Sequence, residues 1–392
     1  MKKILYTLVA IGLAINLQAQ EKYQMKGNNN YAEIDILSSY YSQDGNNGAV
    51  TGGVGTEQLT DLSSIIVINI PLDSTKSING SFGSDYYTSA STDNIDSNKS
   101  SASSKDVRTY GNLGYSQKWL NSGLTLGGRG GFSVEYDYTS INGGLNLAKE
   151  FNQGNSEISI STQAFFDEWG LYFPRELRGQ VNVSTTKRKA YNASISYSQV
   201  INKKLQVAIT AEAIYMEGLL STPFHRVYFE DTVLPDIERL PSSRLKIPVS
   251  MRATFYAMET LVLRSYYRFY SDDFGIQGHT FSLEAPIKVS DVFTVSPFYR
   301  FHTQNESKYF APFAIHNSNE VFYSSDFDLS SLSSNKLGLG ISYSPLYGVS
   351  RAKIPLSKKL FLFNSIGLRG SYYKRSTGLK AYSIAIEMNF RI

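Results

Sequence analysis

The last twelve residues, AYSIAIEMNFRI (381–392), constrain the fold of this chain more than any other stretch. One set of alternate positions is apolar: Tyr382, Ile384, Ile386, Met388, Phe390 and Ile392. The positions between them are mainly polar: Ser383, Ala385, Glu387, Asn389 and Arg391. A period of two residues predicts a β-strand with one oily and one polar face. Such a strand at a chain terminus is typical of the closing strand of an outer-membrane β-barrel, which has lipid on one side and a wet lumen on the other.

The first nineteen residues predict a secretory signal. Two lysines precede an apolar run from Ile4 to Leu17, and the small residue Ala19 offers a cleavage point. The apolar run is shorter than the ~20 residues that a spanning helix needs. We therefore expect a signal peptide at 1–19, a short periplasmic lead at 20–30 and a single barrel domain at 31–392 in the cell outer membrane.

Composition argues against several other classes of protein. The chain has no Cys, so we expect no disulfide, no thiolate metal site and no lipid-anchor cysteine. Its formal net charge is +4, of which Lys2 and Lys3 in the signal supply two, so we expect no nucleic-acid partner. The glycine-rich GGVG (52–55) lacks the following Lys and helix of a phosphate-binding loop, and we expect no cofactor.

The alternation recurs along the chain and predicts an all-β, up-and-down antiparallel barrel of about sixteen strands. No later segment is an uninterrupted apolar run of ~20 residues, so spanning helices are not expected. The expected strands are 31–41, 63–71, 78–89, 106–118, 123–137, 140–151, 156–167, 189–200, 205–216, 244–257, 260–271, 278–288, 292–303, 338–346, 361–375 and 380–392.

The lengths of the connections follow the parity of the strands. After even-numbered strands the links are mostly tight turns, whereas after odd-numbered strands several are long, at 42–62, 90–105, 168–188, 217–243 and 304–337. Short turns on one side and long loops on the other predict periplasmic turns and extracellular loops. The link 347–360 is long where it should be short, and this leaves fourteen strands open as an alternative.

Charged residues at lumen-facing positions form the main candidate site. Later strands bring basic side chains together around one acid: Lys246, Arg252, Arg264, Arg268, Lys288 and Arg300, with Glu284. Earlier strands carry mainly acids: Glu33, Asp35, Asp85, Glu135 and Asp137, with Arg129. Opposed basic and acidic walls would set a transverse field across a water-filled pore. In the alternative, these charges pair with one another and with Tyr hydroxyls and fill the lumen.

Three groups of oxygen ligands are candidates for a divalent cation. The loop QDGNNG (43–48) offers Asp44 and Asn46 at alternate positions with Asn47, although an Asn-Gly turn explains it more simply. Two acidic groups could bind divalent ions, including those that bridge lipopolysaccharide. They are Asp272 with Asp273, and Glu230 with Asp231, Asp236 and Glu238.

The histidines offer no convincing catalytic constellation. His279 and His302 fall near the outer ends of their strands, and His225 and His316 fall in long loops. An outer-membrane hydrolase would need a Ser beside such a His, and no nucleophile motif is visible in the sequence. We therefore do not expect an enzyme.

Long motifs across the chain resemble one family. They are YYSQDGNNGAVTGGVGTEQLTD (40–61), DYYTSASTDNID (85–96), SSASSKDVRTYGNLGYS (100–116), EYDYTSINGG (135–144), FHRVYFED (224–231), ERLPSSRLKIPVSMR (238–252), YYRFYSDDFGIQGHTFSLEAPIK (266–288), PFYRFHTQNESKYFAPF (297–313) and YSSDFDLSSLSSNKLGLGISYSP (323–345). This set is similar to the family known as domain of unknown function 3570. The resemblance implies a Gram-negative outer-membrane barrel, often encoded beside a small lipoprotein, a thioredoxin-like protein or a flavin transferase. It implies no reaction and no catalytic residues.

Two functions remain open at this point. One is a passive or gated channel for small polar solutes. The other is a structural or accessory barrel that binds a small lipoprotein or another cell-envelope partner through its loops. The expected surroundings are outer-membrane lipid and lipopolysaccharide. The lengths of 217–243 and 304–337 allow these loops to fold inward, which favours restricted permeability.

Overall fold

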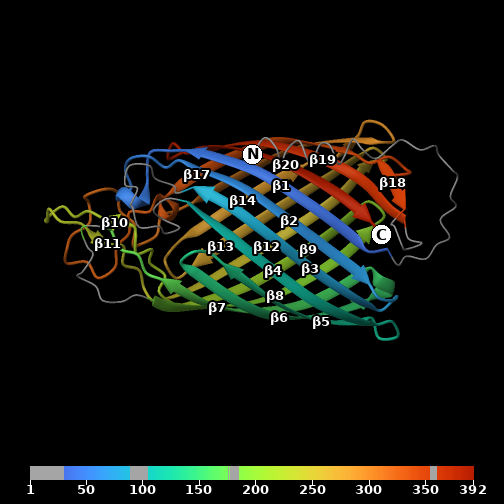
Figure 1. Ribbon diagram of the computed structural model, residues 1–392, viewed down its shortest axis with the longest axis horizontal. Helices are drawn as coiled ribbons and strands as arrows, with labels where there is room; N and C mark the ends of the chain where they lie inside the picture. Colours follow the sequence, from blue (N-terminus) through green and yellow to red (C-terminus); the bar gives the residue numbers. More distant parts are fainter. Residues whose placement is uncertain (1–30, 89–104, 175, 177–184, 354–359) are drawn as a thin grey trace.

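The computed structural model describes residues 31–88, 105–174, 176, 185–353 and 360–392. The expected signal and lead at 1–30 lie outside the described residues, as do most of the expected loop 90–105 and part of the loop 168–188. All described strands except β10 (Arg226–Val227) and β11 (Asp236–Ile237) form one antiparallel sheet that closes on itself as a barrel (Figure 1).

The wall strands follow one another around the barrel in chain order. They are β1 (Glu33–Asp44), β2 (Leu59–Pro71), β3 (Lys76–Thr88), β4 (Lys105–Trp119), β5 (Leu124–Val134), β6 (Tyr138–Phe151), β7 (Ser156–Gly170), β8 (Thr185–Asn202), β9 (Leu205–Gly218), β12 (Ser243–Met258), β13 (Leu261–Asp272), β14 (Gln277–Glu284), β15 (Ile287–Lys288), β16 (Phe293–Gln304), β17 (Leu332–Tyr343), β18 (Ser350–Lys353), β19 (Leu360–Arg375) and β20 (Lys380–Arg391). β15 continues β14, and β18 continues β17 after a break, so the eighteen segments make sixteen wall strands. The expected sixteen-stranded barrel is confirmed, and the fourteen-stranded alternative is wrong.

The barrel closes where the first strand meets the last. β1 pairs with β20 in a register that runs from Glu33 opposite Arg391 to Asp44 opposite Lys380. Beyond the seam, Ala32 and Ile392 exchange two backbone hydrogen bonds of 3.1 and 2.9 Å. A closed wall leaves no unpaired strand edge, which is the condition for placing a sheet in hydrocarbon.

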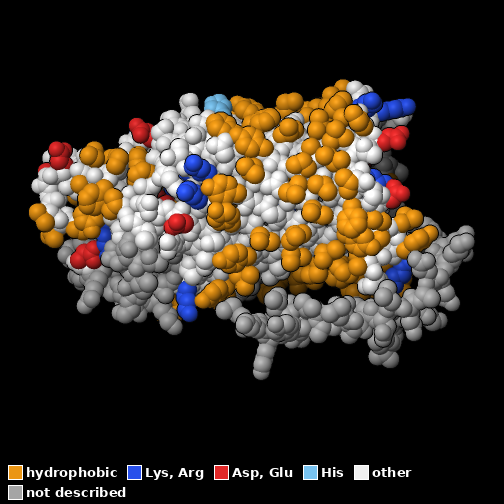
Figure 2. All heavy atoms as spheres, turned by 90° about the horizontal axis from the view of Figure 1, so that it is seen from above, with side chains coloured by type: hydrophobic (Ala, Val, Ile, Leu, Met, Phe, Trp, Pro, Cys, Tyr) orange, Lys and Arg blue, Asp and Glu red, His pale blue; other side chains and the backbone are white. Residues whose placement is uncertain are grey.

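The register sorts side chains onto two faces, as the alternation predicts. On the face that Figure 2 shows, hydrophobic side chains cover the middle of the outer wall, and Lys, Arg, Asp and Glu side chains lie mainly toward its two ends. Aromatic pairs stand on the outer wall near each end: Phe293 with Tyr343 and Phe363 with Phe390 toward the short turns, and Phe166 with Tyr191 and Tyr372 with Tyr382 toward the long loops. An apolar band between two aromatic girdles is the outer surface of a transmembrane barrel. Among the described residues, no helix is long and apolar enough to cross a membrane.

The two ends of the barrel differ in the length of their links. Most described turns at one end are tight, including 120–123, 203–204 and 259–260. The long link at that end, which left the strand count open, contains β18, paired with the start of β19. Long loops stand at the other end, and short turns with long loops identify these as the periplasmic and extracellular ends.

The hydrophobic core of this protein lies in its loops. We call the three described loops 45–58, 219–242 and 305–331 the cap. The cap contains the short strands β10 (Arg226–Val227) and β11 (Asp236–Ile237), the 3-10 segments η1 (Ala49–Thr51) and η4 (Phe327–Leu329), and a buried cluster of Val227, Phe229 and Tyr323. The barrel wall is held by its backbone pairing and needs no such core, whereas loops without regular backbone pairing need buried apolar contacts to hold one conformation.

Candidate functional site

A cationic wall lines one side of the lumen. Six basic side chains occupy lumen-facing positions on five strands from β12 to β19: Arg252, Arg264, Arg268, Arg300, Lys336 and Arg369. Five of them, all but Arg268, line a cavity of about 650 Å³ together with Tyr266, Phe298 and Glu284. The expected residues Arg252, Arg264, Arg268, Glu284 and Arg300 therefore lie on neighbouring strands of one wall.

Glu284 is the carboxylate partner within this wall. Its Oε1 lies 2.7 Å from an Nη of Arg369, and its Oε2 lies 3.9 Å from an Nη of Arg264. The guanidinium of Arg369 also stacks on the Phe298 ring, 3.8 Å from the ring centroid. Glu284 is thus shared by Arg264 and Arg369.

The remaining cations have no carboxylate partner in the described part of the chain, where no acid lies within 4.0 Å of Arg252, Arg268, Arg300 or Lys336. Arg300 and Lys336 stand directly opposite each other on β16 and β17. Like charges directly opposite across two strands are destabilising, so this arrangement costs stability that water or an anion must offset.

The acids expected on the facing wall are mostly bonded to the protein. Glu33 forms a 3.1 Å ion pair with Arg391, and the Oδ1 of Asp35 accepts a 2.6 Å hydrogen bond from Asn389. Glu135 accepts a 2.6 Å hydrogen bond from the Tyr87 hydroxyl. Asp85 and Glu135 each lie within 4.0 Å of Arg108. Asp137 lies with Asp106 and Glu135 in a group of three carboxylates. The lumen therefore combines acids that are bonded to the protein, of which Glu33 has a close cationic partner, with cations that have no carboxylate partner among the described residues.

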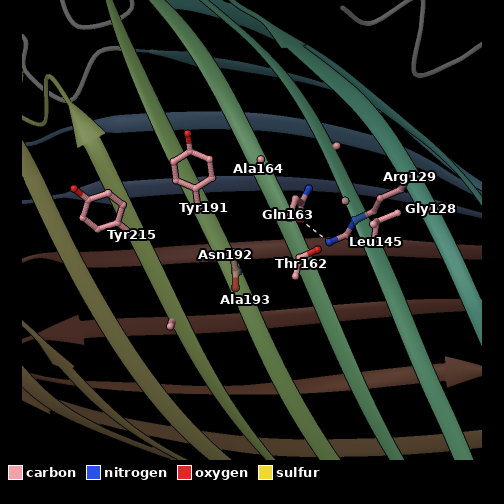
Figure 3. Close-up of a pocket in the computed structure, with 13 residues that line it drawn as sticks. Gly128, Arg129, Leu145, Thr162, Gln163, Ala164, Tyr191, Asn192, Ala193 and Tyr215 are labelled. Atoms are coloured by element: carbon pink, nitrogen blue, oxygen red, sulfur yellow. Dashed lines mark hydrogen bonds between the residues drawn. The ribbon is translucent and has the colours of Figure 1, made fainter.

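The wall around Arg129 is lined by small residues. Figure 3 shows the guanidinium of Arg129 joined to the amide oxygen of Gln163, at 2.5 Å, beside a depression that Tyr191 and Tyr215 flank. The depression has a volume of about 750 Å³. Its Gly and Ala positions are mainly on the outer parity, which leaves a hollow in the lipid-facing wall, whereas Arg129 lies on the lumen parity.

The cap joins opposite sides of the barrel mouth. The loop 45–58 follows the first strand and 219–242 follows the ninth, so they start eight strands apart in a sixteen-stranded barrel. Arg226, which is 5% exposed, nevertheless donates a 2.7 Å hydrogen bond to the carbonyl of Val50. It also donates a 3.1 Å hydrogen bond to Glu176. Contact between these loops requires that they meet above the lumen.

A second buried arginine attaches the cap to the wall. Arg375 at the outer end of β19 contacts Asp328 of loop 305–331 at 2.6 Å and Glu57 of loop 45–58 at 3.2 Å. Burial raises the pKa of Glu57 to about 7, while Arg375 opposes the shift and Asp328 adds to it. Glu57 therefore changes its charge near neutral pH, at a junction between two cap loops.

Most of the cation-ligand candidates from the sequence are dispersed, Glu238 being the exception. Asp272 already accepts hydrogen bonds of 3.0 Å from Arg244 and 2.7 Å from the Tyr270 hydroxyl, and Asp273 accepts one of 3.0 Å from the Leu245 amide. Asp44 accepts a 3.0 Å hydrogen bond from Gln58, and within the described ranges it joins no group of three His, Asp or Glu ligands. Of the acids 230–238, Asp231 binds Ser318 and Asp236 accepts from the Tyr323 hydroxyl.

The histidines of the wall are bonded within it. The His302 Nδ1 lies 2.9 Å from the Thr280 hydroxyl, and its Nε2 lies 3.2 Å from the Gln304 amide oxygen. Thr280 is buried, so this hydroxyl is not presented to a substrate. His279 stands on the outer parity, 2.8 Å from the Tyr267 hydroxyl.

Sequence reasoning missed Lys336 and Arg369. Lys336 fell within the expected loop 304–337, although β17 begins at Leu332. Arg369 lay inside an expected strand, and its parity with Ser371 and Ser365 would have placed it in the lumen. The cap contacts carry no periodic signal in the sequence.

Solved structures with a similar shape include three outer-membrane proteins. A bacterial polysaccharide outer membrane secretin is 13% identical, with a TM-score of 0.48, over 93% of this chain and 99% of that one. A BenF-like porin from Pseudomonas fluorescens is 9% identical, with a TM-score of 0.42, over 92% and 98%. OmpT lacking loop L8, an outer membrane protein of Vibrio cholerae, is 9% identical, with a TM-score of 0.43, over 91% and 99%.

A search of curated proteins finds no match to this chain. A family model, by contrast, matches residues 7–350, which is most of the sequence and includes β1 to β17. The resemblance seen in the long motifs is thereby confirmed. The chain belongs to the family described as "Protein of unknown function (DUF3570)".

Proposed function

We propose that this barrel is a gated channel for small anionic solutes across the outer membrane. The observation that carries the proposal is the pair formed by Arg300 and Lys336, which lie directly opposite each other on adjacent strands, with no carboxylate of the described residues within 4.0 Å of either. A wall that only filled the lumen would be expected to neutralise such a pair, as Glu33 and Arg391 neutralise each other at the seam. A ring of basic side chains selects anions in a pore.

The cap supplies the gate in this proposal. Loops from opposite sides of the barrel contact each other through the buried side chain of Arg226. A solute can therefore enter only where the loops separate or where they leave an opening at their side. Short-lived separation of a loop contact is cheaper than any change in the wall, where every strand is paired on both sides.

Ion selectivity in planar bilayers tests the proposal. Full-length refolded protein is placed between two KCl solutions that differ tenfold in concentration, and the reversal potential is measured with and without Arg226→Gln, which is expected to loosen the cap. We expect anion selectivity, and we expect Arg300→Gln with Lys336→Gln to shift the reversal potential toward zero. No conductance in any of these proteins contradicts a channel.

A matched control removes the same charge from the outer wall. Lys149 and Lys189 stand on the outer parity of β6 and β8. The double variant Lys149→Gln with Lys189→Gln should leave the reversal potential where the wild type has it. An equal shift in this control would show that the lumen pair has no special role.

A specific observation favours a second candidate function, the binding of a cell-envelope partner through the loops. Val233 and Leu234, between β10 and β11, are 94% and 75% exposed. Apolar side chains at a protruding tip are typical of binding surfaces. Site-specific cross-linking from position 233 in intact cells should then yield one discrete adduct that Leu234→Ser abolishes. A smear of products that Leu234→Ser leaves unchanged would count against a partner.

A further inference from the structure

Three potential metal ligands from two cap loops converge at one point. His225 and Glu238 flank the β10–β11 hairpin, and Asp326 precedes η4 in the loop 305–331. The His225 Nδ1 lies 3.9 Å from the Glu238 Oε1 and 3.9 Å from the Asp326 Oδ2. One ligand atom of each residue lies within 4.8 Å of those of the other two.

The imidazole nitrogen at the centre of this group is buried and unsatisfied. Within the described residues, the His225 Nδ1 has no hydrogen-bond partner. Its 3.9 Å separations are too long for direct hydrogen bonds. They are close to the separations in a metal site, because a tetrahedral zinc with bonds of about 2.0–2.2 Å to nitrogen and oxygen holds its donor atoms ~3.4 Å apart, so each carboxylate need move only ~0.5 Å toward the imidazole.

The carboxylates are held in place by other bonds. Glu238 is 4% exposed, and its Oε2 accepts a 2.7 Å hydrogen bond from the Thr222 amide while its Oε1 accepts one of 2.5 Å from the Ser324 hydroxyl. The Oδ1 of Asp326 accepts a 2.9 Å hydrogen bond from the Asp328 amide, which leaves Oδ2 directed to His225. Such outer contacts orient the ligands of metal sites.

We propose that His225, Glu238 and Asp326 bind one divalent cation of the zinc type, with water completing its coordination. Two carboxylates and a neutral imidazole balance a charge of two, and this donor set suits zinc better than calcium, which prefers oxygen ligands alone. The chain has no Cys, so no thiolate site competes. The bound cation fastens the loop after β9 to the loop after β16.

His316, in the same cap, shows how a histidine beside a carboxylate is bonded when no metal is needed. The His316 Nδ1 contacts the Glu320 Oε2 at 2.7 Å and its Nε2 contacts the Ser324 carbonyl at 3.0 Å, so both ring nitrogens are satisfied. His225 also lies beside carboxylates, but within the described residues its Nδ1 has no hydrogen-bond partner. A protonated His225 standing between two carboxylates is the competing explanation, and it requires no metal.

Zinc titration of the full-length, tag-free protein in detergent tests the proposal. We expect calorimetry to show one Zn²⁺ per chain, and we expect His225→Gln and Asp326→Asn each to weaken binding at least about tenfold. His279→Gln, the same substitution on the outer wall, should bind as the wild type does. Heat-modifiable migration in gels confirms that each variant retains the barrel.

Proteolysis provides a second readout that does not depend on conductance. Zn²⁺ should slow cleavage within 219–242 in the wild type and have no such effect in Asp326→Asn. A wild type that binds no Zn²⁺ overturns the site and leaves the protonated histidine as the explanation. Equal binding by wild type and His225→Gln overturns the ligand assignment. The channel proposal stands or falls separately, on the reversal potential.

Discussion

Arg226 donates a hydrogen bond of 2.7 Å to the backbone carbonyl of Val50, which lies 176 residues away in the sequence and on a loop from the opposite side of the barrel. The guanidinium is buried and also binds Glu176, so three extracellular loops meet at one side chain. The mouth of this barrel is therefore spanned by protein.

Loss of Arg226 should open the mouth. Arg226→Gln removes the ion pair with Glu176 and weakens the hydrogen bond to Val50. We expect this to lower the stability of the cap by about 2 kcal/mol. Loss of one partner of a fully buried ion pair costs about 3–5 kcal/mol, and the cost is smaller here because Glu176 is partly exposed. Single-channel recording should show more frequent openings. The exposed Arg239, paired with Asp236, supplies the control Arg239→Gln. Indistinguishable records for the two variants would contradict a gating role.

The channel should open more readily as the pH rises from 6 to 8. The pKa of Glu57 is raised from 4.5 to about 7, mainly by burial, so the closed cap binds a proton that the opened cap releases. The contribution of protonated Glu57 to the stability of the closed cap is fully present below about pH 4.5. It is lost as the pH rises through about 7, and its upper limit is roughly 3 kcal/mol. The side chains that act on this carboxyl are Arg375, Asp328 and Asp326, together with the backbone of Asn47.

Glu57→Gln isolates this effect, because the neutral amide keeps the shape of the protonated acid. The variant should open at pH 8 no more often than the wild type does at pH 6. Burial also raises the pKa of Asp326 to about 6, so a residual pH dependence is expected in the variant. A full wild-type pH response in Glu57→Gln would exclude this carboxyl as the sensor.

Gly338 should tolerate no side chain. A Cβ at this position would meet the ring of Phe298 and the carbonyl of Gly370, and the same ring carries the guanidinium of Arg369 on it. Gly338→Ala therefore displaces Phe298 and with it Arg369, at a cost of about 1–3 kcal/mol. Urea unfolding in lipid vesicles measures this loss of stability. The reversal potential of Gly338→Ala should shift toward zero, as we also expect for Arg369→Gln, because both variants remove the Arg369 charge from its place in the wall. Gly370→Ala, whose Cβ meets nothing within 4 Å, is the control.

The ion pair at the seam should contribute little. Glu33 and Arg391 lie 3.1 Å apart, but both side chains are 42% exposed. We expect a coupling below about 1 kcal/mol in a double-mutant cycle of Glu33→Gln and Arg391→Gln, followed by urea unfolding. The seam is held by its backbone hydrogen bonds. A coupling above about 2 kcal/mol would show that the side chains decide closure.

The wall could be predicted from the sequence because lipid and water impose a period of two on it. The expected strands 205–216 and 244–257 agree with Leu205–Gly218 and Ser243–Met258 to within two residues. The expected start of 338–346 was wrong, since β17 begins at Leu332. Its first outward residues, Ser333 and Asn335, are polar, so the alternation is lost toward the rim of the membrane.

The cap could not be predicted, because its contacts follow no period. Arg226 and Val50 come together only after eight strands have been placed between their loops. The grouping of His225 with Asp326 has the same origin: each residue is unremarkable in its own segment, and only the folded loops bring the two together.

The pairing of β1 with β20 means that the first strand to be made waits for the last one. Until residues 381–392 pair with β1, the backbone donors and acceptors along its free edge would have no hydrogen-bond partners in the hydrocarbon of the bilayer. Whatever inserts this protein must shield that edge until the last strand is in place. A chain shortened by its final strand would consequently be left as an open trough in the bilayer.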